Sequence, residues 1–434
     1  MNWVPVYALL LFLSTLVTYL IAMLIAHTES RDRKKGYLVL SLVLNFGILF
    51  FFKYYNFING AIFEFLGYFH LRWEVPNLYV LLPVGISFYI FQAVGYSIDV
   101  YRGDVAPQRH FGIYALFVSF FPQLVAGPIE RAKNLLPQFY EKHHFVHVRA
   151  VKGLKLMLWG YFLKLVVADR LALYVDSVYN NLPQHDGSSV LLATFFFNFQ
   201  IYGDFAGYSF IAIGAAKIMG FDLMDNFRRP YFSKSISEFW SRWHISLSTW
   251  FRDYLYISLG GNRVTFGRWQ FNLLVTFLVS GIWHGANWTF IFWGTLHGLF
   301  LIFGNIRRKF SPGIFPQMMS NKHPFLLIAA NFILVTITWI FFRANSLTDA
   351  LLIFDKIFSM QGNVFMGGSL SYMVYAFSGI MLLVFIEYTR EFHSQINLFE
   401  HPSEVVRYSS YTFLVILILS IGVFDGGQFI YFQF

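Results

Sequence analysis

The chain of 434 residues contains no cysteine, and only 13% of its residues are charged. Without cysteine the protein has no structural disulfide, no thiolate zinc site, no cysteine nucleophile and no thioester link to its own chain. The low charge excludes an ordinary soluble domain, in which about a quarter of the residues are charged. The sequence also lacks the motifs of dinucleotide binding, P-loop phosphate binding, the serine nucleophile elbow and helical zinc-protease sites.

Hydrophobic residues make up 57% of the chain, which contains 54 Phe, 26 Tyr and 11 Trp. Apolar runs of about 17–25 residues, long enough to cross the hydrocarbon of a bilayer, recur along its length. We therefore predict an all-α polytopic membrane protein with about ten transmembrane helices and additional interfacial or re-entrant helices. No linker or repeat divides the sequence, so we predict a single integral-membrane domain over residues 1–434. The expected spans begin near Pro5, Gly36, Leu78, Gly112, Val151, Val190, Trp269, Ala286, Pro324, Tyr372 and Tyr411.

Basic residues indicate how the chain is oriented in the membrane. The first apolar run, Pro5 to Ala26, lacks the basic flank and cleavage site of a removed signal peptide, so we expect it to stay as a helix. The next loop contains Arg31, Arg33, Lys34 and Lys35, which predicts that it faces the cytoplasm. The net charge of +9 fits loops that face anionic membrane lipid, and no basic stripe indicates nucleic acid.

A few ionisable residues fall inside the apolar runs, where each costs a few kcal/mol and calls for a reason. Lys164 and Asp169 fit a structural network at a helix end. Asp204 is harder to dismiss, because it lies among Gly203 and Gly207, where small residues allow another helix to approach closely. A carboxylate at this position needs a nearby donor, which makes Asp204 a candidate supporting residue of a site.

The segment from Ser235 to Tyr256 is too polar to span a membrane and is rich in Trp and Tyr. Its apolar residues recur at three- and four-residue steps, with Arg242 among the charged residues of the other side. We predict one amphipathic helix that lies in the interface or re-enters the protein. His244 falls at the border of the apolar face, where it is either an incidental residue of an anchor or a residue that looks into the protein.

The stretch SGIWHGANW places His284 beside Trp283, between Gly281 and Gly285, in an otherwise apolar run. If this segment is helical, His284 and Asn287 share one face beside small residues that let a helix or a ligand approach. Imidazole can take and return a proton near neutral pH. The pattern alone is compatible both with a packed, hydrogen-bonded histidine and with a catalytic one.

No histidine group in the sequence predicts a metal site. His284 and His297 are separated by about 20 Å of rise in a single helix, so they cannot pair unless that helix breaks. His143, His144 and His147 have a spacing that could hold a metal, but they lie among basic residues and fit a solvated loop better.

Several stretches taken together resemble the membrane-bound O-acyltransferase (MBOAT) family, in order and at family-like spacing from about residue 80 to 345. The resemblance is strongest to the alginate and peptidoglycan O-acetyltransferase branch, and the lipoteichoic-acid D-alanylation protein is a more distant sibling. The matching stretches are LLPVGISFYIFQ (81–92), FFPQLVAGPIERAKNLLPQF (120–139), YGDFAGYS (202–209), EFWSRWHISLSTWFRDYLYISLGGNR (238–263), GIWHGANWTFIFWGTLHG (281–298) and FFRA (341–344).

The resemblance implies transfer of an acetyl group from a cytoplasmic thioester, acetyl-CoA, towards a hydroxyl of an extracytoplasmic polysaccharide such as alginate or peptidoglycan. It implies the bacterial cytoplasmic membrane, no permanently bound cofactor and an extracytoplasmic acetyltransferase partner that completes the transfer. The family's invariant histidine in WHG corresponds to His284, and its polar position in RWHxS corresponds to His244. Phe210 stands where relatives commonly carry an acidic residue after GYS, so the chain departs from the family pattern at this position.

Our hypothesis from the sequence is that His284 is the general base and that His244 orients or binds substrate. Asn287 or backbone amides would stabilise the oxyanion, with Asp204, Arg242 and Trp283 in binding or supporting roles. Two alternatives stay open: a D-alanyl transferase fed by an acyl carrier protein, and a transporter that moves a substrate without acylating it.

Overall fold

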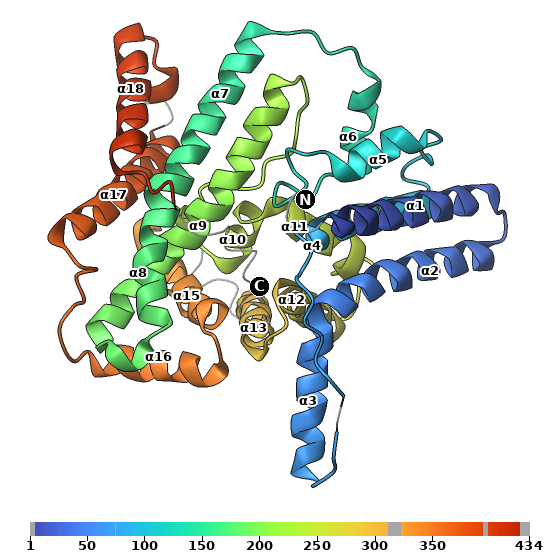
Figure 1. The fold of residues 1–434 in the computed structure, drawn as a ribbon, viewed down its shortest axis with the longest axis horizontal. Coiled ribbons are helices and arrows are strands. Elements are labelled where there is room, and N and C mark those ends of the chain that lie inside the picture. The colour runs from blue at the N-terminus through green and yellow to red at the C-terminus, as the bar shows by residue number, and fades with distance from the viewer. Residues whose placement is uncertain (1–4, 74, 311–322, 394–397, 426–434) are drawn as a thin grey trace. The chain divides into compact units, whose positions relative to one another are not determined.

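A computed structural model of the chain describes residues 5–73, 75–310, 323–393 and 398–425, which form helices and loops without a β-strand (Figure 1). The predicted all-α class is therefore confirmed. The backbone groups into two compact units, residues 1–145 with 219–224 and residues 146–218 with 225–434. The single domain over residues 1–434 stays a prediction.

The first unit is built around α1, which packs against α2, α4 and α5. Buried polar side chains join these helices: the Ser14 hydroxyl donates to Asn45 Oδ1 (2.6 Å), and the hydroxyls of Ser41 and Ser97 share a hydrogen bond (3.1 Å). Such bonds satisfy the polar groups inside an apolar bundle. The helices are α1 (Val6–His27), α2 (Arg31–Leu49), a π-helical turn (Phe50–Tyr54), α3 (Tyr55–Tyr68), α4 (Ile86–Arg102), α5 (Phe111–Ser119) and α6 (Ala132–Leu135).

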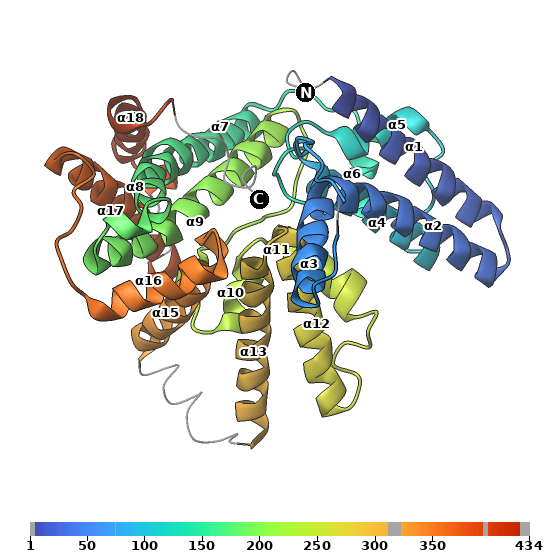
Figure 2. The same ribbon diagram turned by 60° about the horizontal axis from the view of Figure 1, so that its bottom comes forward.

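The second unit is organised around α9 (Gly187–Ile218), which lies beside α7 in both views (Figures 1 and 2). Glycines let the two helices touch: a Cβ added at Gly160 would lie 2.6 Å from the Gly207 oxygen, and one at Gly153 would lie 2.6 Å from the Gly214 oxygen. The preceding helices are α7 (His147–Tyr161), a π-helical turn (Phe162–Ala168) and α8 (Asp169–Tyr179). The later helices are α10 (Ile236–Arg242), α11 (Ile245–Phe251), α12 (Phe266–His284), α13 (Trp288–Phe310), α15 (Pro324–Arg343), α16 (Leu347–Ser359), α17 (Leu370–Phe392) and α18 (Glu404–Ile421).

Within the described residues, six helical stretches are long and apolar enough to cross a membrane. They are Val6–His27, Arg31–Tyr68, Trp288–Phe310, Pro324–Arg343, Leu370–Phe392 and Glu404–Ile421. The figure of about ten spans is therefore not confirmed. The span predicted near Gly112 is wrong, because α5 has 9 residues and rises only about 14 Å. The helix expected near Leu78 begins later, at Ile86, after a non-helical stretch, and it is not one of the six spanning stretches.

The prediction of one amphipathic helix from Ser235 to Tyr256 is also wrong. The chain forms α10, breaks at Trp243 and His244, continues as α11 and ends in a π-helical turn. His244 has the left-handed φ of +42°, which ends a right-handed helix. At the break, Arg242 O accepts from the Arg228 amide (2.9 Å), and the Ile245 amide donates to Asn226 O (2.9 Å). These bonds to a neighbouring segment replace the helical ones.

Candidate active site

His284 is the last residue of α12, and a short break separates it from α13. Gly285 is fully extended there, and a Cβ added to it would lie 2.1 Å from the Phe290 ring, so only glycine fits. After the break, Asn287 Oδ1 accepts a hydrogen bond from the Thr289 amide (3.1 Å) and caps the first turn of α13. The sequence GAN therefore stops one helix and starts the next directly after the histidine.

The His284 side chain is buried, with 3% of the residue exposed, among aromatic rings from three helices. Its ring centroid lies 4.9 Å from that of Trp283, 4.8 Å from Trp293 and 5.2 Å from Phe342. All three pairs are edge-to-face, which is a favourable arrangement of aromatic rings. The imidazole is thus enclosed by aromatic rings in a site that limits access of bulk water.

His297 lies on α13 and packs against the same Trp293, with ring centroids 5.0 Å apart. Its Nδ1 accepts a hydrogen bond from the Trp240 indole (3.2 Å), and its Nε2 lies 3.0 Å from the Thr338 hydroxyl. That hydroxyl donates to the Val335 carbonyl (2.7 Å), so His297 Nε2 is the donor to Thr338. The helix does break between the two histidines, but both nitrogens of His297 have structural partners.

His244 is fully buried, with an exposed fraction of 0%, at the break between α10 and α11. Its ring centroid lies 4.4 Å from that of Phe205 and 6.3 Å from that of Trp283. Burial lowers the pKa of His244 well below its usual value, so the ring is neutral at neutral pH. Trp283 is therefore an aromatic neighbour of both candidate histidines, and the structure brings His244, Trp283 and His284 into one cluster.

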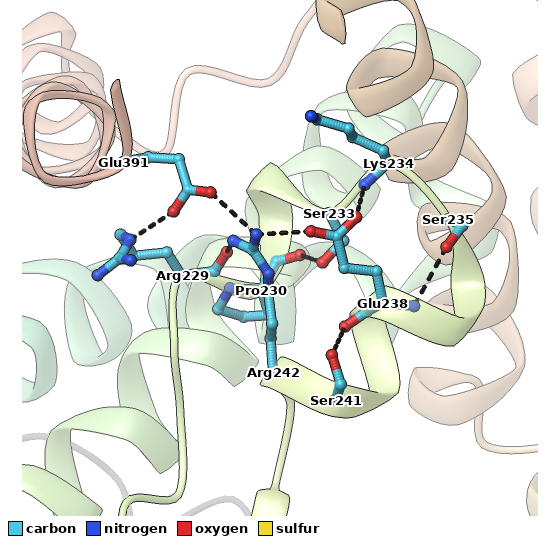
Figure 3. Close-up of polar contacts among 9 residues, drawn as sticks. All are labelled: Arg229, Pro230, Ser233, Lys234, Ser235, Glu238, Ser241, Arg242 and Glu391. Carbon is cyan, nitrogen blue, oxygen red and sulfur yellow. Dashed lines mark hydrogen bonds and ion pairs between the residues drawn. The ribbon is translucent and has the colours of Figure 1, made fainter. Parts of the chain in front are cut away.

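Arg242 is the centre of an ion-pair network that joins α10 to α17 (Figure 3). Its guanidinium lies 2.6 Å from Glu238 Oε1 and 2.9 Å from Glu391 Oε1, and it donates to the Arg229 carbonyl (3.4 Å). Burial acts to lower the pKa of Arg242, but the hydrogen bond and charge of Glu391, with Glu238, outweigh it and raise the pKa. Arg229 closes the network through Glu391 Oε2 (2.7 Å). The guanidinium holds the chain directly before the break at His244.

Asp204 on α9 forms an ion pair with Lys164, whose Nζ lies 2.7 Å from Asp204 Oδ1. Lys164 also reaches Asp169 Oδ1 at 2.8 Å, so one ammonium bridges two carboxylates. The donor that the sequence required for Asp204 is therefore present, and the expected network of Lys164 and Asp169 exists. These contacts give Asp204 a structural role, and a role in chemistry stays a prediction.

Asn287 does not share a helix face with His284, because α12 ends before it, so the condition of a single helix is not met. Its side-chain amide donates to the Asn345 carbonyl (2.8 Å), in the loop between α15 and α16. Together with the cap on α13, this bond ties two loops together. The geometry favours a positioning role, so backbone amides are the better candidates for oxyanion donors.

The sequence did not single out several residues of this site. Trp293 and Phe342 pack against His284, Asn226 contacts His244, and Glu391 pairs with Arg242. Trp293 and Phe342 had a usable signal, because they belong to the matched stretches 281–298 and 341–344. Asn226 and Glu391 lie in no periodic pattern that would mark them.

A cavity of about 520 Å³ lies between the α10–α11 segment and the helices α12 and α13. Most of its lining is apolar, with serine and threonine hydroxyls and two arginines among the lining residues. Trp240 forms part of the wall and also packs against Trp293, with ring centroids 5.7 Å apart. Ser280, one turn before His284 on α12, lines it as well. The cavity therefore reaches the immediate surroundings of the histidine cluster.

Gly281 fixes how closely α12 and α13 approach beside His284. A Cβ added at Gly281 would lie 2.3 Å from the Phe290 oxygen, so Gly281→Ala must push the helices apart. We expect a loss of about 1–3 kcal/mol in the free energy of unfolding, measured as a lower thermal midpoint of the detergent-solubilised protein. Gly267→Ala, on the same helix but with no atom within 4 Å of the added Cβ, is the control. Equal midpoints for Gly281→Ala and the control would contradict the close approach.

The sequence of the chain is similar to that of known acyltransferases, and the similarity covers the residues of the candidate site. A profile of MBOAT, the membrane-bound O-acyltransferase family, matches residues 107–346, a range that holds His244, Trp283 and His284. A protein named probable alginate O-acetylase from Pseudomonas aeruginosa is 40% identical over 359 residues, 82% of this chain and 67% of that protein.

Two further relatives belong to other acyl-transfer systems. A peptidoglycan O-acetyltransferase from Helicobacter pylori is 36% identical over 392 residues, 83% of this chain and 72% of that protein. A teichoic acid D-alanyltransferase from Bacillus subtilis is 28% identical over 243 residues, 52% of this chain and 60% of that protein. The chain therefore belongs to the membrane-bound O-acyltransferase family and is a multi-pass membrane O-acyltransferase.

Proposed function

We propose that the protein moves acetyl groups from a cytoplasmic thioester, acetyl-CoA, towards hydroxyls of an extracytoplasmic polysaccharide such as alginate or peptidoglycan. The names of the relatives at 40% and 36% identity support acetyl as the acyl group and an envelope polymer as the acceptor. The proposal places the enzyme in the bacterial cytoplasmic membrane. It includes an extracytoplasmic acetyltransferase partner that completes transfer to the polymer.

The observation that carries the proposal is the buried His284 in its cage of Trp283, Trp293 and Phe342. A hydroxyl is a weak nucleophile until a base within hydrogen-bond reach takes its proton. In the proposed reaction His284 takes that proton while the hydroxyl oxygen attacks the thioester carbonyl. The new C–O bond forms, the C–S bond breaks, and the proton passes from the imidazolium to the departing thiolate.

His244 has a different role in this proposal. It is buried and neutral and shares Trp283 with His284, so it is suited to hold a hydroxyl by hydrogen bonding. Two histidines beside one tryptophan would let the site bind the acceptor at one imidazole and take its proton at the other. Exclusion of bulk water by the aromatic rings would limit hydrolysis of the thioester.

The cavity beside α12 is a candidate route for the acyl donor. Arg252 and Arg308 belong to its lining, and guanidinium groups bind phosphate well. The pantetheine arm of a coenzyme A thioester carries apolar, amide and hydroxyl groups, which match the mixed apolar and hydroxyl lining. We propose that the donor enters here and that its thioester reaches His284 past Trp240.

The test of the proposed function is the acetate that mild alkali releases from envelope polysaccharides. Cells that lack the gene are compared with the same cells that carry the wild-type gene or an empty vector. We expect acetate to return only with the wild-type gene, at verified membrane abundance. Acetate that never depends on the gene would overturn the proposal.

The alternative of D-alanyl transfer is measured in the same hydrolysate, because D-alanine esters are also alkali-labile. The similarity to a D-alanyltransferase at 28% identity favours D-alanine as the alternative acyl group. Gene-dependent release of D-alanine without acetate would show that the transferred group is D-alanine. The donor would then be an acyl carrier protein in place of acetyl-CoA. Transport of substrate by reconstituted protein without any acyl donor would favour a transporter instead.

A further inference from the structure

Asn226 lies in the loop before α10 and has an exposed fraction of 1%. Its side-chain oxygen Oδ1 lies 3.1 Å from His244 Nδ1, 3.2 Å from the Ser246 amide nitrogen and 2.9 Å from the Ser246 hydroxyl. Its side-chain nitrogen donates to the Ser209 hydroxyl on α9 (3.0 Å). The residue thus connects α9 to His244 and Ser246 of the RWHIS stretch.

The backbone amide of Ser246 fixes which way the Asn226 side chain points. A backbone N–H can only donate, so the atom that faces it at 3.2 Å must be the amide oxygen. The opposite orientation would place the NH₂ group against an N–H and would lose the bond. The orientation of Asn226 is therefore set by a donor that cannot change its role.

This orientation determines the tautomer of His244. An amide oxygen only accepts, so the His244 Nδ1 that faces it must carry the hydrogen. The Ser246 hydroxyl donates to the same oxygen and lies 3.4 Å from Nδ1, which is consistent with a shared Nδ1–H. In a neutral imidazole a hydrogen on Nδ1 leaves the lone pair on Nε2.

Asn226 also supports the backbone of His244. The Asn226 carbonyl accepts from the Ile245 amide (2.9 Å), directly after the left-handed residue. A non-glycine residue at a φ of +42° is costly and persists only where its surroundings hold it. Side-chain and main-chain atoms of one asparagine therefore fix both the direction and the tautomer of the imidazole.

We infer that Asn226 is the positioning residue that fixes His244 as the Nδ1–H tautomer, so that His244 receives the acceptor hydroxyl as a hydrogen-bond acceptor through Nε2. The inference rests on the proposed function for the identity of that hydroxyl. It assigns complementary tasks to the two histidines: His244 holds the hydroxyl, and His284 removes its proton. A substrate group without an O–H or N–H to donate would not be held by His244.

The test combines changes at Asn226 with a change at His244. Asn226→Leu keeps the size but removes the acceptor, and we expect it to lower acetyl transfer by about 10²-fold, as for a misplaced site group. Asn226→Asp keeps an acceptor oxygen opposite Nδ1–H and should retain most of the transfer. In a His244→Gln background, Asn226→Leu should cause no further loss, because the imidazole that it positions is absent.

Membrane abundance and thermal midpoint are measured for each variant, and transfer is expressed per folded molecule. Additive losses from Asn226→Leu and His244→Gln would show independent roles and would overturn the inference. Full transfer by Asn226→Leu would also overturn the inference. The proposed function would still stand in that case if acetate depended on the wild-type gene. Acetate independent of that gene would remove the proposed function instead.

A second measurement does not depend on whether the leucine variant folds. Histidine nitrogen NMR of the purified, isotope-labelled full chain, minus the spectrum of His244→Gln, gives the signals of His244 alone. We expect a neutral ring with the hydrogen on Nδ1, and the same tautomer in Asn226→Asp. A hydrogen on Nε2 of His244 in the wild-type protein would overturn the inference whatever the activity of the variants.

Discussion

Replacement of His284 by alanine should lower acetyl transfer by about 10²–10⁴-fold, the usual contribution of a general base. The proton of the acceptor hydroxyl then has no imidazole to receive it inside the aromatic cage. Trp283, Trp293 and Phe342 stay in place, so binding of donor and acceptor should change less than the rate of transfer. The measurement is alkali-releasable acetate from cells that carry the variant at wild-type membrane abundance.

His297→Gln is the matched control for this change. His297 is also buried and also packs against Trp293, but its nitrogens bond to Trp240 and Thr338. Glutamine offers both a donor and an acceptor, so transfer per folded molecule should stay close to that of the wild type. Equal acetate from His284→Ala and wild-type cells would mean that His284 is a packed histidine and that the base lies elsewhere.

The helices beside His284 could be predicted from the sequence because their signals are local. Apolar runs that begin near Trp269 and Ala286 correspond to α12 and α13. The break between them follows from Gly285 and from a capping asparagine, Asn287, which are short-range features. Likewise, a carboxylate in an apolar run must have a partner, and Asp204 has one in Lys164.

The break at His244 could not be predicted, because its cause is distant in the sequence. Apolar residues on both sides of the break face the same core, so the helical period continues through it. The bonds that stabilise the break come from Asn226 and Arg228, in a loop without any periodic pattern. An apolar period of 3.6 residues predicts which side chains are buried. It does not predict hydrogen bonds to the backbone of a distant segment.

The ion-pair network around Arg242 could not be predicted from local sequence patterns either. Glu391 lies on α17, well beyond the family match that ends at residue 346, yet it bonds to both Arg242 and Arg229. Arg229 has a left-handed φ of +47°, as His244 has +42°. The ion pairs therefore hold the side chain of Arg229, which is one of the two left-handed residues, and of Arg242, which lies two residues before the other. In this way α17 supports the segment that leads to His244.

The second large effect is expected at Lys164, whose ammonium bridges Asp169 and Asp204. Lys164→Met would leave two carboxylates, with side-chain exposures of 8% and 5%, without their shared cation. Removal of one partner from a buried ion pair typically costs about 3–5 kcal/mol. We expect a large loss of folded protein from the membrane, measured as abundance and as the thermal midpoint in detergent.

A triple variant, Lys164→Met with Asp169→Asn and Asp204→Asn, separates stability from chemistry. It removes the uncompensated charges together with the cation, so much of the lost abundance should return. If Asp204 serves only as a partner of Lys164, acetyl transfer per folded molecule should also return. Recovered abundance without recovered transfer would show that the Asp204 carboxylate takes part in the reaction, whereas normal abundance of Lys164→Met alone would contradict the buried ion-pair network itself.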